Sequence, residues 1–323
     1  MNRRELIKRS AAIGAMAVIP SSVIGCGSAG SGVPAESAAM EGTRVKSAKL
    51  TAASNVVLNP LKPPSAGVIP VAFVISDGVD PIDTFGPWDV FHQAVGSVPF
   101  HPYSVGESTK PVTLMGGGIK LVPEFTFANA PAPKVVVIPA QRGNEAMLSW
   151  IRKVTKTTDV TMSVCTGADL LARTGLLAGK SATTHHGDYR ALAVAFPDIT
   201  VKRGVRFVED GNLATAAGLS SGIDLALRVV ERYFGREAAK KTAYQLEYQG
   251  EGWMNPASNQ MYAAVKESTE ERPLCPVCEM AVDPATSPKT VYKGKTYYFM
   301  AQQHKQQFET APEKFLKAAE KKM

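Results

Sequence analysis

The sequence predicts an α/β fold, a sandwich in which helices cover both faces of a mostly parallel sheet, followed by a small C-terminal α+β module. Between residues 67 and 250, short apolar runs of strand length alternate with segments of helical periodicity. This alternation is typical of a parallel sheet that is buried on both faces. Beyond residue 272 the pattern changes to a cysteine pair, two aromatic-rich strands and two short helices. The length of 323 residues also favours more than one domain.

Continuous apolar runs predict strands at residues 69–75, 135–138, 160–164 and 213–217. Helical spacing predicts helices at residues 87–94, 144–155, 167–173, 221–233 and 236–248. Ligands bind at the carboxyl ends of the strands in such sheets. At these ends the chain places Asp83 after the first strand, Ala140 and Gln141 after the second, and Cys165 at the end of the third.

The first 26 residues have the organisation of an export signal with a lipidation site. Arg3 and Arg4 precede an apolar run over residues 11–24, which is too short for a transmembrane helix. The paired arginines resemble a twin-arginine signal. Cys26 ends the run as in a lipobox, where the cysteine is acylated and becomes the new N-terminus; the alternative is an incidental cysteine after an ordinary cleavage site. We therefore expect an extracytoplasmic lipoprotein, anchored in the membrane on its periplasmic side by lipid on Cys26.

The composition of the chain bears on its linker, on nucleic-acid binding and on disulfide bonds. Residues 27–66 are rich in Ser, Ala, Gly and Pro without periodicity, which predicts a flexible linker. The net charge of +7 comes from scattered Lys and Arg residues with no recognition motif, so we expect no nucleic-acid partner. Four cysteines in so long a chain do not form a disulfide framework.

Cys165 is the candidate nucleophile. It stands where an apolar strand passes directly into a helix, so it occupies a tight turn like a nucleophile elbow. The helix start favours the reactive thiolate, which predicts an accessible thiol of low pKa. The amide of Thr166 is placed to point at an oxyanion. The alternative is a buried cysteine that acts as a small hydrophobic residue.

Four ordered motifs then carry a family resemblance. They read Ser-Val-Cys-Thr-Gly-Ala-Asp-Leu-Leu-Ala at residues 163–172, Ala-Thr-Thr-His at 182–185, Val-Glu-Asp-Gly-Asn-Leu-Ala-Thr-Ala-Ala-Gly at 208–218 and Asp-Thr-Phe-Gly-Pro-Trp-Asp-Val-Phe at 83–91. Residues 67–250 resemble the ThiJ/PfpI family (class I glutamine amidotransferase-like), near isonitrile hydratases and amidase-like regulator domains. The resemblance implies a flavodoxin-like sandwich, a small-molecule substrate and no cofactor in this domain. We also expect a homodimer.

The resemblance assigns roles to two further residues. Asp83 matches the acidic residue that hydrogen-bonds the nucleophilic cysteine, so the pKa values of these two groups should be coupled; the alternative for Asp83 is a helix N-cap. His185 matches a candidate catalytic histidine, although His186 stands where relatives have an aromatic residue. Gln141 replaces a glycine of a Gly-Gly pair that supplies oxyanion amides in the family, which puts the substrate in doubt but not the fold.

Residues 272–323 form the C-terminal module. Cys275-Pro-Val-Cys278, Tyr297-Tyr-Phe299 and Pro312-Glu-Lys-Phe315 resemble a YHS domain. Cys275, Cys278 and His304 offer two thiolates and an imidazole, with Met300 or Met280 as a soft fourth ligand. This set suits Zn²⁺ or Cu(I). The alternatives are a disulfide between the two cysteines and a metal-free fold.

Two function classes follow from these features. The first is a lyase or hydrolase that acts on a small carbon–nitrogen compound through Cys165, with isonitrile hydration as the nearest activity of the family. The second is a non-catalytic extracytoplasmic lipoprotein in which Cys165 senses oxidants or electrophiles and the C-terminal module senses metal. A DNA-binding regulator is disfavoured, because no DNA-binding helix pair follows residue 250 and the signal directs export.

Overall fold

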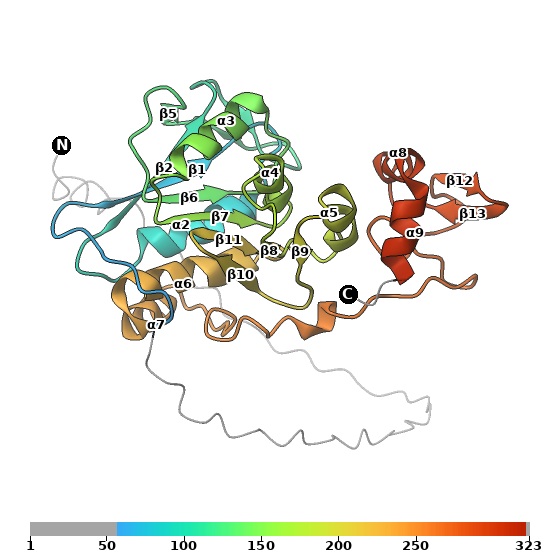
Figure 1. Cartoon of the computed structure of the whole chain (residues 1–323). Helices are drawn as coiled ribbons and strands as arrows, with labels where there is room; N and C mark the ends of the chain where they lie inside the picture. Colours follow the sequence, from blue (N-terminus) through green and yellow to red (C-terminus); the bar gives the residue numbers. More distant parts are fainter. Residues whose placement is uncertain (1–56, 321–323) are drawn as a thin grey trace, which may run out of the picture. The chain divides into compact units, whose positions relative to one another are not determined.

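The structure is a computed structural model that describes residues 57–320. A seven-stranded sheet with the order β10-β11-β7-β6-β1-β2-β5 forms its centre (Figure 1). The strands are β1 (Ile69–Val74), β2 (Phe100–Gly106), β5 (Phe125–Thr126), β6 (Val135–Ile138), β7 (Val160–Val164), β10 (Phe207–Asp210) and β11 (Leu213–Ala216). Each neighbouring pair is parallel except the β10–β11 pair, which is antiparallel. The predicted α/β sandwich with a mostly parallel sheet is confirmed.

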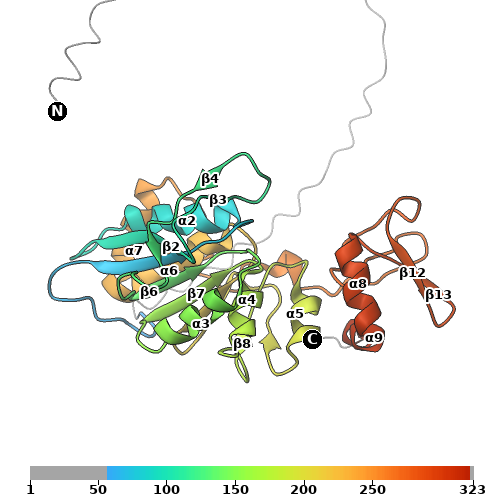
Figure 2. The same cartoon turned by 90° about the horizontal axis from the view of Figure 1, so that it is seen from above.

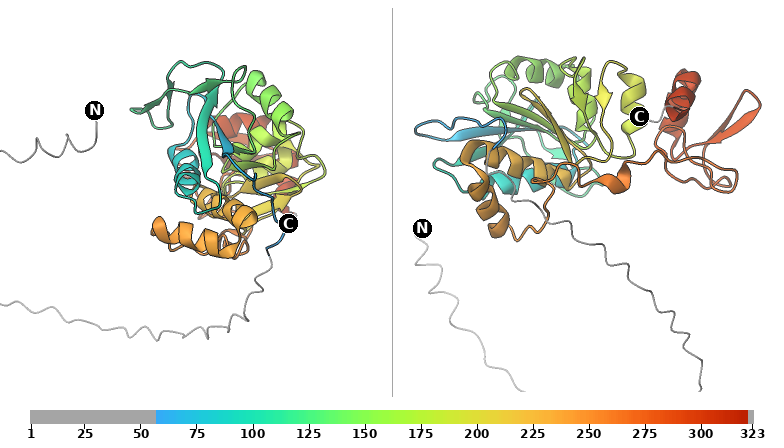
Figure 3. Two further views of the ribbon diagram at one scale, coloured as in Figure 1. Left: turned by 90° about the vertical axis from the view of Figure 1, so that its left-hand side faces the viewer. Right: turned by 60° about the horizontal axis from the view of Figure 1, so that its bottom comes forward.

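Helices pack on both faces of this sheet because side chains alternate along each buried strand. One hydrophobic core joins Val71 and Phe73 of β1 to α2 (Pro81–His92), α6 (Ser221–Phe234) and α7 (Arg236–Gln245). A second core joins Ala72 and Val74 to α3 (Glu145–Val154), α4 (Gly167–Arg173) and α5 (Tyr189–Ala195). In Figure 3 the orange α6 and α7 lie on the opposite side of the sheet from the green α3.

Smaller pairs of strands complete the domain. They are β3 (Val112–Thr113) with β4 (Lys120–Leu121) and β8 (Ser181–Ala182) with β9 (Thr200–Val201), and a 3₁₀ helix, η2, follows at Gln260–Tyr262. The β3–β4 ribbon is visible in Figure 2, and its Leu114 packs on Ile75 and Val79 at the end of β1.

Strand register brings three predicted site segments to one edge of the sheet. Phe73 pairs with Val137, and Ile138 pairs with Ser163, so β1, β6 and β7 end side by side. The residues that follow these strands therefore converge at their carboxyl ends. These residues include Asp83 in α2, Ala140 after β6 and Cys165 after β7.

The first helix differs from the prediction. Helix α2 begins at Pro81 and not at Pro87, because the Asp80 side chain caps its N-terminus by accepting hydrogen bonds from the Ile82 and Asp83 amides. Pro87 lies inside the helix. Strand β2 and helix α5 were not predicted. The sequence of β2, Phe-His-Pro-Tyr-Ser-Val-Gly, alternates in burial and lacks a continuous apolar run.

The C-terminal module has the predicted hairpin and two helices. They are β12 (Lys289–Tyr292), β13 (Lys295–Tyr298), α8 (Gln302–Thr310) and α9 (Pro312–Glu320). Its core combines both cysteines of the Cys-Pro-Val-Cys segment with Phe299, Phe308 and Phe315.

Cys26 and the export signal lie outside the described residues. Within residues 57–320, the helices are either too short or too polar to cross a membrane.

Candidate active site and metal centre

Cys165 occupies a strained turn between β7 and α4. Its φ of +57° lies in the left-handed region, which non-glycine residues rarely adopt. The Cys165 amide donates to Ala216 O at 3.2 Å and Ala217 O at 3.0 Å, and the Thr184 hydroxyl donates to the Cys165 carbonyl at 3.0 Å. Bonds from two neighbouring segments thus hold the nucleophile elbow that the sequence predicts.

Gly167 permits the close approach that the elbow needs. A Cβ added at this position would lie 2.1 Å from the Ile138 carbonyl oxygen at the end of β6. Backbone cannot yield to such a contact as a flexible side chain can. A glycine two residues after the cysteine is therefore a steric requirement of this turn.

The Cys165 thiol is buried, with 7% of the residue exposed, so the expectation of an accessible thiol was wrong. Burial raises the pKa of this thiol, and the nearby Asp83 carboxyl raises it further. The amides of Thr166 and Leu219 donate to the sulfur and lower the thiol pKa, but burial outweighs them. The sequence prediction counted the helix start and did not count the cost of burying a thiolate.

Leu219 was not foreseen as part of the site. Its φ of +50° places the residue in the left-handed region directly after Gly218. In this conformation its amide reaches the Cys165 sulfur. The run Gly-Leu-Ser-Ser-Gly at residues 218–222 indicates a turn, but it does not show where a leucine amide will point.

Asp83 is completely buried beside this turn. Its Oδ2 accepts a hydrogen bond from the Ala140 amide at 3.1 Å. Burial, and then repulsion from Asp80, raises the pKa of the Asp83 carboxyl to about 7, while hydrogen bonds from Ala140 and Cys165 act in the opposite direction. The N-cap alternative for Asp83 is not realised, because Asp80 caps the helix.

A buried thiol beside a buried carboxyl forms a coupled acid–base pair. The Asp83 charge raises the pKa of the Cys165 thiol, whereas the hydrogen bond from the thiol acts to lower the pKa of Asp83, so the thiol is the group of the pair that holds its proton more firmly. Transfer of the thiol proton to the Asp83 carboxylate would leave a thiolate beside a neutral carboxyl. The two amide donors at sulfur stabilise that charge distribution.

His185 lies close to the elbow. A Cβ added at Gly218 would lie 2.6 Å from the His185 Cδ2 atom, so the imidazole rests directly on this glycine. The Gly187 amide donates to His185 Nδ1 at 3.1 Å, and Asp188 Oδ2 lies 3.4 Å from the same nitrogen. Asp188 therefore stabilises the ring when Nδ1 carries a proton. It was not singled out from the sequence, although its spacing of three residues from His185 was a signal.

His186 has a different environment from His185. Its ring stacks on Tyr262 with centroids 4.4 Å apart, and burial lowers its pKa. Of the two candidate bases, His185 is the one whose ring rests on Gly218, the residue after the Ala217 carbonyl that accepts the Cys165 amide hydrogen bond.

The Gln141 side chain is tied to the strand ends. Its amide nitrogen donates to Val74 O at 2.7 Å and to Pro139 O at 3.3 Å, and its oxygen accepts from the Ser76 hydroxyl at 2.7 Å. The preceding amide, that of Ala140, donates to Asp83. This amide is thus committed to the carboxyl and is not aimed at an oxyanion.

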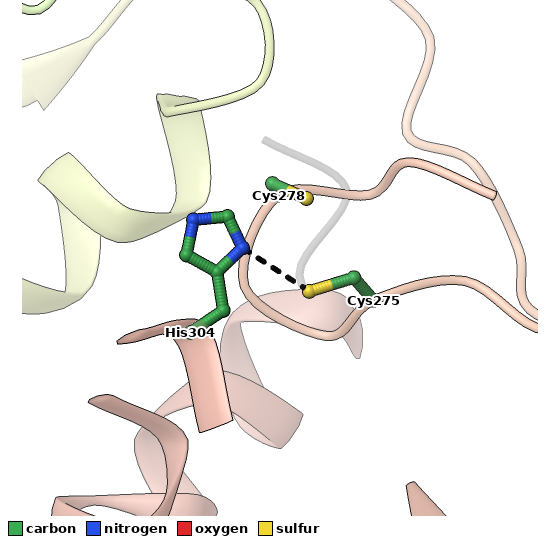
Figure 4. A group of neighbouring side chains, drawn as sticks. All are labelled: Cys275, Cys278 and His304. Carbon is green, nitrogen blue, oxygen red and sulfur yellow. Dashed lines mark hydrogen bonds between the residues drawn. The ribbon is translucent and has the colours of Figure 1, made fainter. Parts of the chain in front are cut away.

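The C-terminal cysteines and His304 form a compact cluster. The three candidate ligand atoms lie within 4.8 Å of one another, and Cys275 Sγ lies 3.6 Å from His304 Nδ1 (Figure 4). Both cysteines are free thiols and are buried. Hydrogen bonds from Cys278 and His304 lower the pKa of Cys275, and the bond to Cys275 raises the pKa of His304.

This cluster fits a metal ion in its donor set and in its backbone. The amides of Met300 and Cys278 donate to Cys275 sulfur, and the Met280 amide donates to Cys278 sulfur. Such amides stabilise thiolates, which are the forms that bind metal. A groove of about 1080 Å³ borders the segment of Cys275. The Met300 residue, one proposed fourth ligand, is 45% exposed.

These two sites define the class of protein: an α/β sandwich with a cysteine elbow, joined to a small module with a Cys-Cys-His cluster. The model of the DJ-1/PfpI family matches residues 70–232, and the model of the YHS domain matches residues 275–319. The chain belongs to the DJ-1/PfpI family and carries a C-terminal YHS domain. The predicted family resemblances are confirmed.

Comparisons with individual proteins agree. The chain is 35% identical over 185 residues to an isonitrile hydratase of Pseudomonas putida, covering 55% of this chain and 78% of that relative. It is 30% identical over 107 residues to a helix-turn-helix-type transcriptional regulator of Pseudomonas aeruginosa, covering 33% of this chain and 32% of the regulator. A crystal structure of a ThiJ/PfpI family protein from Pseudomonas syringae superposes with a TM-score of 0.52 at 26% identity, over 64% of this chain and 84% of that one.

Proposed function

We propose that the protein is a cysteine-dependent lyase that hydrates a small isonitrile to the corresponding N-substituted formamide. The observation that carries this proposal is the buried Cys165–Asp83 pair at a strained elbow, with two amides donating to the sulfur. The terminal carbon of an isonitrile must receive both a nucleophile and a proton. A thiol beside a carboxyl that takes and returns one proton can supply both. The similarity to the isonitrile hydratase of Pseudomonas putida supports the same reaction class.

In the proposed reaction Asp83 takes the thiol proton, and the Cys165 thiolate adds to the terminal carbon of R–N≡C. Asp83 then returns the proton to that carbon, which gives the thioimidate R–N=CH–S–Cys165. Water adds to the same carbon, and its hydrogen moves to nitrogen. The C–S bond breaks, the remaining hydroxyl proton passes to Asp83, and R–NH–CHO leaves with the thiolate restored. We assign to His185, whose ring rests on Gly218, the role of orienting or deprotonating the water.

The test uses the full chain with cyclohexyl isonitrile and an aryl isonitrile. Loss of the N≡C infrared band and appearance of the formamide signal in NMR report turnover. We expect Cys165→Ala to abolish turnover and Asp83→Asn to lower kcat at least 100-fold, a typical contribution of general acid–base catalysis. Equal rates for the wild type and Cys165→Ala would refute the proposal.

We further propose that Cys275, Cys278 and His304 bind Zn²⁺ or Cu(I). Elemental analysis of reduced protein and thermal melting with each ion test this. Cys275→Ser should reduce bound metal and stabilisation more than His304→Ala, because water can replace an imidazole more readily than a thiolate. The absence of stoichiometric metal, together with unchanged melting on addition of either ion, would overturn it.

We also propose that the mature protein is an extracytoplasmic lipoprotein anchored through Cys26, as the basic start and apolar run of the sequence support. Intact-mass analysis of membrane-extracted protein should show loss of residues 1–25 and an acylated Cys26. A soluble, unmodified form in cells with a working lipoprotein pathway would contradict this.

A further inference from the structure

A buried charge cluster joins the YHS domain to the DJ-1/PfpI domain. Glu279, the residue after Cys278, lies 3.0 Å from an Arg190 side-chain nitrogen and 2.7 Å from an Arg203 side-chain nitrogen. The three side chains are 5–6% exposed, and the described residues fall in one compact unit. Burying these charges costs several kcal/mol per ion unless partners are well placed, so the cluster fixes one orientation of the metal loop.

Helix α5 is shared by the two domains. Its Arg190 donates to the Pro276 carbonyl, inside the Cys-Pro-Val-Cys loop, at 2.9 Å. Its Ala191 and Val194 pack on the module's core of Phe308 and Phe315. In Figure 4 the His304 ring lies between this loop and the yellow-green part of the chain to which α5 belongs.

The segment just before α5 leads to the cysteine elbow. A Cβ added at Gly187 would lie 3.3 Å from Met280 Cε and 3.2 Å from His185 Nδ1, so this glycine lies between the metal loop and the imidazole. The imidazole in turn rests on Gly218, and the preceding residue, Ala217, accepts the Cys165 amide hydrogen bond. Packed groups therefore run without interruption from the metal loop to the nucleophile.

We propose that metal bound by Cys275, Cys278 and His304 controls the reactivity of Cys165 through residues 185–190. This inference rests on the proposed metal site. Cys275 and Cys278 of the Cys-Pro-Val-Cys loop and His304 of α8 would hold the ion together, and this would order the loop, keeping Glu279 between the two arginines and Met280 against Gly187. The His185 ring is then kept on Gly218 beside the elbow, and the thiol reacts faster. Without metal the loop loosens and His185 loses its support.

The experiment measures iodoacetamide alkylation of Cys165 in the full chain by peptide-resolved mass spectrometry, with and without Zn²⁺. We expect Zn²⁺ to accelerate alkylation at least fivefold, the lower end of ordinary allosteric coupling. Cys275→Ser should remove the acceleration.

Two variants test the route. Arg203→Gln should still bind Zn²⁺ in competition with a chromogenic chelator, yet its acceleration should fall below twofold; Met280→Ala serves if Arg203→Gln does not fold. Arg152→Gln is the matched control, since it removes an ion pair with Glu145 and a hydrogen bond to the Thr174 carbonyl, both outside the metal loop and residues 185–190, and it should keep the full acceleration.

Three results would overturn the proposal: no Zn²⁺ binding, binding with less than a twofold change in alkylation, or full acceleration in Arg203→Gln. Isonitrile turnover by metal-free protein tests the proposed reaction separately. Failure of the coupling and failure of the proposed activity are thus distinguished.

Discussion

At the residue scale, the chemistry depends on where one proton resides. A cysteine with a low pKa is reactive because much of it is thiolate at neutral pH. Cys165 differs, because burial raises the pKa of its thiol. In the proposed reaction the proton acceptor is therefore the neighbouring Asp83 carboxyl, whose pKa burial raises to about 7. A carboxyl with this pKa can both accept and return a proton near neutrality, which an exposed aspartate cannot do.

We predict that Cys165 alkylation rises with pH around a midpoint of about 7, the pKa of Asp83. Below this pH the carboxyl is protonated and cannot take the thiol proton; above it the carboxylate is free to take that proton as the sulfur attacks the reagent. Alkylation rates between pH 5 and 9 measure the profile. Asp83→Asn should abolish the rise in alkylation rate around pH 7, because the asparagine amide cannot accept the thiol proton. A midpoint that is unchanged in the variant would exclude Asp83 as the base.

A second prediction concerns Gly218, on which the His185 ring rests. In Gly218→Ala the new methyl group would lie 2.6 Å from His185 Cδ2, so the ring must rotate away. We expect isonitrile turnover to fall about 10- to 100-fold while the melting temperature changes little, because the displaced group is a side chain and not backbone. His185→Ala is the comparison. The double variant tests whether the two residues act together. If its turnover falls by the product of the two single-variant fold-losses, Gly218 acts independently of His185 and the prediction is wrong.

At the element scale, apolar runs predicted β1, β6, β7 and β11 and the helices around them, because strands buried on both faces need continuous hydrophobic sequence. The same reasoning missed β2, whose exposed His101 and partly buried Pro102 interrupt the run. The elbow was predicted because strand, cysteine and glycine are contiguous. The Leu219 amide was not, since contacts between segments distant in sequence depend on how loops pack and not on local composition. Asp188 was also missed, although it lies only three residues from His185.

The elbow itself gives a prediction at this scale. Gly167→Ala should destabilise the domain by about 3 kcal/mol or more, because the added methyl group meets the Ile138 carbonyl and β6 cannot move without breaking its ladder. Gly175→Ala is the control: its φ of +81° costs ~1–2 kcal/mol, but nothing lies within 4 Å of the new methyl group. Urea unfolding compares the two. Equal losses would mean that the elbow relaxes around a side chain.

At the scale of the whole molecule, the DJ-1/PfpI domain and the YHS domain contact each other through α5. Apolar packing of Ala191 and Val194 supplies area, while the Arg190–Glu279–Arg203 cluster supplies orientation. The sequence predicted the two families to which these domains belong. It could not predict that the two domains contact each other. Nothing in the local sequence around Glu279 indicates that this residue pairs with arginines far back along the chain, yet Arg203 and Glu279 form an ion pair across 76 residues.

The charge cluster gives the last prediction. Glu279→Gln should lower stability by about 3–5 kcal/mol, because it leaves Arg190 and Arg203 buried without a countercharge. Replacing all three residues by Met should recover most of that loss, since buried ion clusters exchanged for apolar groups of similar volume are often neutral or stabilising. Thermal unfolding of the single and triple variants, measured without metal, makes the comparison. A triple variant less stable than Glu279→Gln would mean that the Arg190 bond to the Pro276 carbonyl and the Arg203 bonds to the Ala263 and Ala264 carbonyls hold the interface, and not the charges.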